Sequence, residues 1–235
     1  MATSVGVDGA GSGWLGVWRS ANSLDSRWFG TADQVLSEFP LATAIGVDIP
    51  IGLAESGPRP SDSQARKFVG RKRQSSIFSS PVRGILDAKT QPEASRRHRE
   101  IDQRGFGVQS FGILPKIRDW DALLRSDARA RRCVFEVHPE VSFSAIAGGE
   151  GCGVSESKKS AEGHRIRREL LAGYFGEAAV DKLLLGVASR FAARDDVLDA
   201  LVALWSAERI AAGLAVSMPT PPTTDSAGLT MAIWY

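Results

Sequence analysis

Two stretches near the start of the chain repeat one pattern of bulky and very small residues. In Val5–Asp8 and Ala44–Ile49, β-branched residues alternate with glycine or alanine, and an aspartate falls near the end of each stretch. Side chains alternate between the two faces of a β-strand. The bulky residues therefore share one face, and the small residues share the other with Asp8 or Asp48. A face of such small side chains lets another group approach the sheet closely.

Similar patterns predict the remaining elements. Trp14–Trp18, after the glycine-rich turn Gly9–Gly13, predicts a strand, and Thr31 is suited to cap a helix over Ala32–Phe39. Other predicted segments are strands at Arg27–Gly30 and Cys133–Val137 and helices at Ala161–Phe175, Ala178–Leu185 and Asp195–Gly213. The proline-rich tail is expected to be a loop, although Met231–Tyr235 is apolar enough to pack.

Residues from about 56 to 130 differ in composition from the segments on either side. Prolines interrupt this region, and basic residues cluster at Arg71–Arg73 and Arg96–Arg99. We interpret it as a long insertion with some helix after the fourth strand. At 235 residues the chain fits a single domain, 1–235, with a core of about 1–55 and 131–215. The order of elements predicts an α/β protein.

The last predicted helix is apolar on almost every side. Its bulky residues lie on one broad face, and the opposite face, which in a surface helix carries charges, is made of alanines. Between Val197 and Ala207 the one charged residue is Asp199. Asp196 and Asp199 are three residues apart and lie on one side, so both are expected to point into the protein or a cleft. Buried carboxylates are costly unless they bind a metal ion or hydrogen-bond donors.

These carboxylates form the candidate catalytic and metal-binding site. Asp8 and Asp48 come at the carboxyl ends of their strands, the edge of an open α/β sheet at which ligands usually bind. With Asp196 and Asp199 they would form a group of acids whose mutual repulsion raises their pKa values and favours a divalent cation. Oxygen-only ligands suit Mg²⁺ or Mn²⁺. Two such ions, about 3.5–4 Å apart, would activate water and stabilise the leaving oxygen in phosphodiester hydrolysis.

Each acid also has an ordinary structural explanation. An aspartate after a strand commonly forms a turn, and acids in the first turn of a helix cap it or complement its dipole. Asp195 is the expected N-cap of the last helix. The repeated pattern of small residues before an aspartate, together with the alanine-faced helix, favours a shared site. Glu136, in a predicted strand, is a further candidate metal ligand, a support for a ligand, or a salt-bridge partner of an arginine.

Composition limits the partners of such a site. The net charge is only +2, so a nucleic acid would need a local basic patch. Candidate phosphate-binding residues are Arg71, Arg73, Arg83, Lys116 and Lys158. For any one of them a solvated surface position is the simpler explanation. Phe78, Phe106 and Phe111 could stack on bases, but a role in the core of the insertion is favoured.

Several classes of protein are disfavoured. The two cysteines and three histidines are too scattered to indicate a disulfide framework or a zinc site. The sequence contains no leader-like segment and no apolar run of membrane-spanning length. We therefore expect a cytoplasmic protein without a membrane partner.

Six segments resemble one family, in the expected order along nearly the whole chain. They are GVDGAGSGWLGV near the start, AIGVDIPIGL at Ala44–Leu53, RKRQSSIFSSPVR at Arg71–Arg83, LPKI at Leu114–Ile117, FEVHPEVSF at Phe135–Phe143 and RDDVLDALVALWSAERI at Arg194–Ile210. The family is domain of unknown function 429, described as a predicted nuclease of the ribonuclease H fold. The resemblance implies a ribonuclease H-like mixed sheet flanked by helices.

The last segment also resembles the closing helix of RuvC-type Holliday-junction resolvases, in which a D-x-x-D-A-L pattern supplies metal ligands. Asp196 and Asp199 match that pattern. By the same similarity, Asp8 matches the first-strand ligand and Asp48 the fourth-strand acid, which is commonly glutamate in that group. The likeness also suggests a homodimer.

Three functions are compatible with these patterns. The leading hypothesis is a metal-dependent nuclease that acts on DNA or RNA. The second is an ATP-dependent phosphotransferase of the actin-like group, because Val7–Gly13 resembles a glycine-rich phosphate loop. Against it, such proteins usually contain two domains of this kind. The third is a non-catalytic module that binds nucleic acid or protein.

Overall fold

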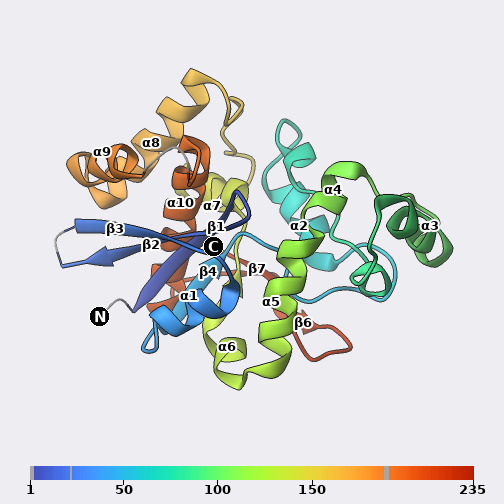
Figure 1. Ribbon diagram of the computed structural model, residues 1–235. Helices are drawn as coiled ribbons and strands as arrows, with labels where there is room; N and C mark the ends of the chain where they lie inside the picture. Colours follow the sequence, from blue (N-terminus) through green and yellow to red (C-terminus); the bar gives the residue numbers. More distant parts are fainter. Residues whose placement is uncertain (1–2, 22, 188–190) are drawn as a thin grey trace.

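The computed structural model describes residues 3–21, 23–187 and 191–235, and it contains a five-stranded mixed sheet (Figure 1). The strand order is β3-β2-β1-β4-β5. The strands are β1 (Ser4–Ala10), β2 (Gly13–Ser20), β3 (Ser23–Phe29), β4 (Ala44–Val47) and β5 (Val134–Glu136). Strand β2 is antiparallel to both β1 and β3, whereas β4 is parallel to both β1 and β5. The α/β class and the mixed sheet predicted from the sequence are confirmed.

Helices cover both faces of this sheet (Figure 1). On one face, the β-branched residues of β1 and β4 pack with α1 (Ala32–Glu38) and α5 (Leu114–Ser126). On the other face, α10 (Arg194–Ala211) contacts β1, β2 and β4 and is itself covered by α7 (Pro139–Ile146) and α8 (Ala161–Phe175). The helix α9 (Glu177–Gly186) packs on α8 and β3. The helix capped by Thr31 and the helix over Ala161–Phe175 are confirmed.

The helix α10 occupies the face of small residues. A Cβ atom added to Gly6 would lie 2.1 Å from both the carbonyl oxygen of Ala200 and the backbone nitrogen of Leu204. At Gly46 the added Cβ would lie 2.8 Å from the carbonyl oxygen of Ala203. The two strands carry glycine at these positions because the helix backbone rests almost directly on the sheet. The element whose close approach the pattern predicted is therefore α10.

The region predicted as an insertion is mostly helical. It contains α2 (Pro60–Phe68), two short 3₁₀ helices at Gln74–Ser76 and Arg83–Ile85, α3 (Gln91–Asp102), α4 (Val108–Gly112), α5 and α6 (Ala128–Cys133). Part of this region belongs to the core of the protein. Trp120 of α5 is fully buried and packs edge to face on Trp14 of β2, with ring centroids 5.6 Å apart. The insertion thus supplies one layer of the protein, whereas α3 projects away from the sheet (Figure 1).

The expectation of a loop in the tail is wrong. Residues Ser217–Thr224 and Thr230–Trp234 form an antiparallel pair, β6 and β7. Prolines lack the N–H group that a strand interior needs, and the pairing is irregular between Met218 and Thr223, where the prolines lie. The apolar end of the tail does pack, because Ala232 and Ile233 are buried. Among the residues that the structure describes, every helix is too short or too polar to span a bilayer.

Candidate active site

Two parallel neighbouring strands bring the first two aspartates together. Asp8 lies in β1, and Asp48 follows β4 directly, with its backbone N–H donating to the carbonyl of Val7 at 2.9 Å. The two carboxyl groups share a hydrogen bond. Burial, followed by the charges of Asp48 and Asp199, raises the pKa of Asp8 well above its ordinary value. Burial also raises the pKa of Asp48, which is half-exposed to the cleft described below.

The first turns of α10 add the other two acids. Asp199 is 2% exposed, and burial raises its pKa to about 7, with further contributions from the charges of Asp48 and Glu140. Asp196 is half-buried, and its charge raises the pKa of Asp8. Because α10 rests on Gly6 and Gly46, the start of the helix reaches the strand ends that carry the other aspartates. All four predicted carboxylates therefore belong to one electrostatically linked group, termed here the carboxylate cluster.

The predicted cap of α10 is wrong. The N-cap is Ala193 instead of Asp195, and the helix begins at Arg194. Asp196 closes the helix end, because its Oδ2 accepts a hydrogen bond from the backbone N–H of Ala193 at 2.8 Å. Asp196 thus has a structural role in addition to its place in the cluster.

Two of the predicted basic residues enter the carboxylate cluster. Lys158 donates from Nζ to Oδ2 of Asp199 at 2.6 Å, and its charge lowers the pKa values of Asp8 and Asp48. Lys116 reaches in from α5, with Nζ donating to the carbonyl of Gly13 at 3.1 Å. Burial lowers the pKa of Lys116, and the nearby acids oppose this effect. The negative charge of the cluster is thus only partly balanced by protein cations.

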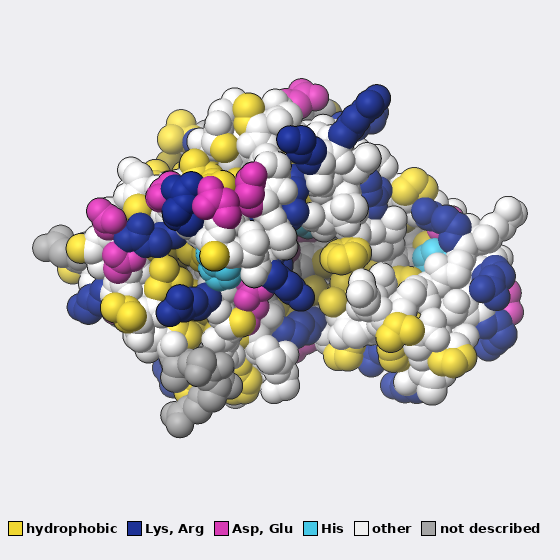
Figure 2. Space-filling model, turned by 90° about the horizontal axis from the view of Figure 1, so that it is seen from above, with side chains coloured by type: hydrophobic (Ala, Val, Ile, Leu, Met, Phe, Trp, Pro, Cys, Tyr) yellow, Lys and Arg dark blue, Asp and Glu magenta, His cyan; other side chains and the backbone are white. Residues whose placement is uncertain are grey.

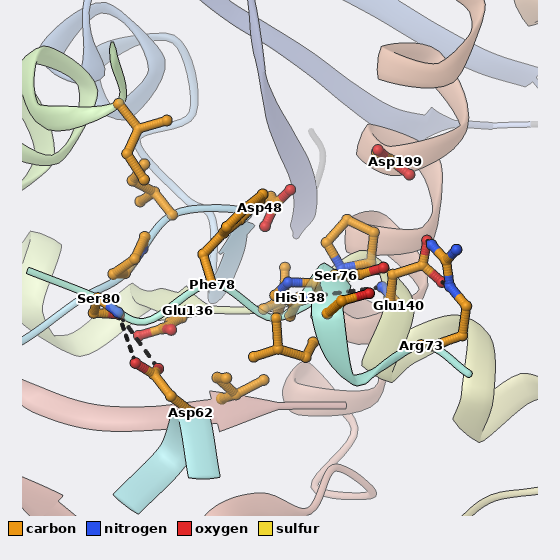
Figure 3. A pocket seen from close by; sticks show the side chains of 18 of the residues that line it. Asp48, Asp62, Arg73, Ser76, Phe78, Ser80, Glu136, His138, Glu140 and Asp199 are labelled. Atoms are coloured by element: carbon orange, nitrogen blue, oxygen red, sulfur yellow. Dashed lines mark hydrogen bonds and ion pairs between the residues drawn. The ribbon is translucent and has the colours of Figure 1, made fainter. Parts of the chain in front are cut away.

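A cleft of about 440 Å³ opens beside the cluster (Figure 3). Asp48, Asp199, Lys158 and Lys159 line it, together with Ser75, Ser76 and Phe78 from the insertion. Phe78 is 57% exposed. Figure 2 shows the molecule hollowed between its two halves, with lysine and arginine side chains beside the hollow. The cleft is therefore lined by acidic side chains on the side of the cluster and by polar and basic side chains elsewhere.

The sequence reasoning missed His138 and Glu140, which lie in this cleft (Figure 3). His138 caps α7, with Nδ1 accepting from the backbone N–H of Glu140 at 3.2 Å, and its charge would lower the pKa of Asp48. This hydrogen bond assigns the proton of the neutral ring to Nε2. A signal was present, because His138 lies two residues after the end of β5, the strand next to β4. The carboxyl ends of these parallel strands lie at one edge of the sheet.

Glu140 holds two arginines at the wall of the cleft. Arg167 donates to it at 2.8 Å and is 1% exposed, so this arginine is buried structure. Arg73, a predicted phosphate-binding residue, donates to the same carboxylate through Nε at 3.3 Å and lines the cleft. The ion pair holds Arg73 at the wall of the cleft.

Glu136 lies apart from the carboxylate cluster, in a buried ion pair. Arg59 donates to it at 2.6 Å and 2.8 Å, and the backbone N–H of Ile51 donates at 2.7 Å. Asp62 binds the same arginine and also the Ser80 backbone (Figure 3). Burial raises the pKa of Glu136 to about 7. Of the three roles considered for Glu136, the structure matches the salt-bridge partner, which here anchors the segment after Asp48.

Other predicted contact residues lie elsewhere. Arg83 pairs with Asp225 and Asp121 and lines a different pocket. Arg71 is exposed on the turn before the first 3₁₀ helix. Phe106 is buried in the core, and Phe111 packs against it, as the simpler explanation held. The structure thus brings Lys116, Lys158 and Arg73 to the site and leaves Arg83 outside it.

The donor set suits a divalent cation in its chemistry but not in its arrangement. Carboxylate oxygens are the ligands that Mg²⁺ and Mn²⁺ prefer. Within the described ranges, however, no three histidine, cysteine, aspartate or glutamate side chains converge closely enough to hold a metal ion. The cation that contacts Asp199 is Lys158.

Comparison with known proteins identifies a family for this chain. The sequence model of a family described as "Protein of unknown function (DUF429)" matches residues 6–224. Comparison with curated proteins and with solved structures finds no match.

Proposed function

The chain belongs to the DUF429 family, and we propose that it is a metal-dependent nuclease that hydrolyses phosphodiester bonds in nucleic acid. The observation that carries this proposal is the electrostatic linkage of Asp8, Asp48, Asp196 and Asp199, which come from β1, the end of β4 and the start of α10. Acids that gather from separate elements and raise one another's pKa values indicate a site of function.

The topology supports a ribonuclease H-like fold. Three antiparallel strands, followed by two parallel strands on the other side of β1, give the order β3-β2-β1-β4-β5. The acids lie in the central strand, after its parallel neighbour and on the helix that crosses them. This matches the arrangement implied by the resemblance to RuvC-type resolvases.

The acids have a clear role in such a reaction. Asp8 and Asp48, which lie side by side, are the proposed ligands of Mg²⁺ or Mn²⁺, and Asp199 and Asp196 add negative charge from the start of α10. Because no three acidic side chains of the described residues converge on one point, binding of the ion would have to draw the acids together. When bound, the cation supplies positive charge to the phosphate and lowers the pKa of the water that attacks it. Burial of the acids favours this use, because buried carboxylates are stabilised by a cation.

The walls of the cleft supply the contacts to a substrate. Arg73 and Lys159 offer positive charge, and Ser75 and Ser76 offer hydroxyl groups, which are the donors that commonly bind phosphate oxygens. His138 carries the N–H at Nε2 when neutral, so it can donate to an oxygen in the cleft. Phe78 offers an exposed ring on which a base can stack.

The experiment is a cleavage assay with end-labelled single- and double-stranded DNA and RNA in Mg²⁺, Mn²⁺ or EDTA. We expect cleavage with a divalent cation and none in EDTA. Asp8→Asn, Asp48→Asn and Asp199→Asn should each lower the rate by about 10²-fold or more. Asp195→Asn is the matched control, because it removes the same charge from the first turn of α10 at a residue that acts on Asp196 but is not among the main influences on the pKa of Asp8 or Asp199. Cleavage that persists in Asp8→Asn would contradict the proposal.

A further inference from the structure

An exposed aromatic ring lines the cleft on a segment that is itself firmly held (Figure 3). Phe78 is 57% exposed, although Ile77 before it is buried. The carbonyl of Ile77 accepts a hydrogen bond from Nε of Arg66 at 3.0 Å. On the other side, the backbone N–H of Ser80 donates to Oδ2 of Asp62 at 2.9 Å. The chain is thus fixed before and after Phe78, and its ring is held at the cleft instead of packing into a core.

Apolar side chains make up a large part of the cleft wall around this ring. The cleft is lined by Phe78 together with Ile49, Pro50, Ile77, Ile113 and Ile233. Its volume of about 440 Å³ falls in the range of sites that enclose a small molecule, which are lined mainly by apolar groups with a few polar ones. The cleft therefore suits a flat ring of low polarity that can pack against Phe78.

Polar groups without a partner lie in the same cleft. Within the described part of the chain, the ammonium group of Lys159 and the hydroxyl groups of Ser75 and Ser76 make no hydrogen bond or ion pair. These groups are donors of the kind that commonly bind phosphate oxygens. Ser75 and Ser76 precede Phe78 by three and two residues, so donors for a phosphate and a ring for stacking come from one segment.

A ring in a cleft of this size can stack only on a base whose face is free. In a double helix the neighbouring pairs cover both faces of each base, and a base reaches a pocket only after it leaves the stack, at a cost of a few kcal/mol. In a single strand the bases unstack readily and bind to aromatic side chains with little dependence on sequence. The combination of ring, apolar wall and phosphate donors therefore favours an unpaired nucleotide.

We propose that the cleft binds single-stranded nucleic acid in preference to the double helix, with one base stacked on Phe78 and a neighbouring phosphate bound by Lys159, Ser75 and Ser76. This inference rests on the proposed function for the choice of nucleic acid as the ligand, and it names the class of substrate. It requires no metal ion, because the ring and the phosphate donors are groups of the protein.

The test measures binding of fluorescein-labelled oligonucleotides of about 12 nucleotides by fluorescence anisotropy, in EDTA so that the proposed hydrolysis cannot proceed. The ligands are oligothymidylate, oligouridylate and a mixed-sequence DNA duplex of the same length. We expect the single strands to bind at least about 10-fold more tightly than the duplex, because the duplex must first extrude a base.

Variants of the exposed ring test the stacking contact. Phe78→Ala should raise the Kd of the single strands by about 5- to 150-fold, the range for loss of one stacked base. Phe78→Trp keeps an aromatic ring and should bind as the wild type does. Leu41→Ala is the matched control, because Leu41 is 62% exposed but lies outside the cleft lining, and it should leave the Kd unchanged.

The dependence on salt separates the two kinds of contact. Lys159→Met should weaken binding and reduce the slope of log K against log salt concentration by about 0.7, the value for one phosphate contact to a single strand. Phe78→Ala should leave that slope unchanged, because stacking releases no counterions.

The outcomes separate the two proposals. A duplex bound as tightly as the single strands, no binding of either single strand, or unchanged binding in Phe78→Ala overturns the inference. Tight single-strand binding that depends on Phe78, without cleavage in Mg²⁺ or Mn²⁺, supports it and contradicts the nuclease. Cleavage of duplex and single strand at equal rates, unaffected by Phe78→Ala, supports the nuclease and overturns the inference. Urea unfolding of each variant confirms that it is folded.

Discussion

Replacement of Gly6 by alanine tests the contact that positions the candidate site. The added Cβ would lie 2.1 Å from backbone atoms of Ala200 and Leu204, well inside the 3.0 Å that Cβ atoms keep. Backbone atoms cannot rotate away as a side chain can, so α10 must move off the sheet. Overpacking of this kind typically lowers the free energy of unfolding by about 1–3 kcal/mol. Because this clash is with backbone atoms and is severe, we expect Gly6→Ala to lower it by about 3 kcal/mol or more. That is a large fraction of a domain's stability of roughly 5–15 kcal/mol.

The assay is urea unfolding followed by tryptophan fluorescence, with the free energy taken from the midpoint and slope. Gly46→Ala, whose Cβ would lie 2.8 Å from the Ala203 carbonyl, should cost about 1–2 kcal/mol. Gly173→Ala is the control, because it adds the same methyl group to an exposed position of α8 with nothing within 4 Å. Gly173→Ala should raise the free energy of unfolding by about 0.5–1 kcal/mol. A Gly6→Ala protein as stable as the wild type would refute the packing argument.

Four further predictions follow from the charges of the site. Asp8→Asn should stabilise the metal-free protein by roughly 0.5–2 kcal/mol in urea unfolding, because it removes a buried charge that its neighbours repel; lower stability would contradict this. Burial raises the pKa of Asp199 from its ordinary 3.8 to about 7, so its contribution to stability is complete below the lower value and lost as the pH rises through the upper one. The melting temperature in EDTA should therefore fall between about pH 4 and about pH 7, and Mn²⁺ should reduce the fall; a rise would refute it. Glu136→Ala removes one of the two carboxylates that bind the buried Arg59 and should lower the free energy of unfolding in urea by about 3 kcal/mol, the low end of the range for a broken buried pair, because Asp62 remains. Calorimetry with ATP should show no micromolar binding, and such binding would favour the phosphotransferase.

The local pattern of the sequence predicts much of the fold. Alternation of bulky and small residues places Val5, Val7, Ile45 and Val47 in one core and reserves the opposite face for a close neighbour. The alanine-rich sequence of the last helix separately predicts a buried helix, and the structure shows that this helix, α10, is the close neighbour. These features depend on spacing within one segment, which a single sequence displays directly.

Other features depend on contacts between distant segments and could not be predicted. Lys158 meets Asp199 across 41 residues, and Arg59 meets Glu136 across 77 residues. No local rule selects Arg59 over the other arginines of the insertion. The β6–β7 pair was missed because its prolines argue against a strand, and their place at an irregularity in the pairing is a tertiary feature.

The most direct test of the account is a crystal structure of the protein grown with Mn²⁺, with the ion located by its anomalous scattering. We expect Mn²⁺ bound by the carboxylates of Asp8 and Asp48. Crystals that show no anomalous peak among these acids at saturating Mn²⁺, or a peak only elsewhere on the protein, would contradict the carboxylate cluster as a metal site.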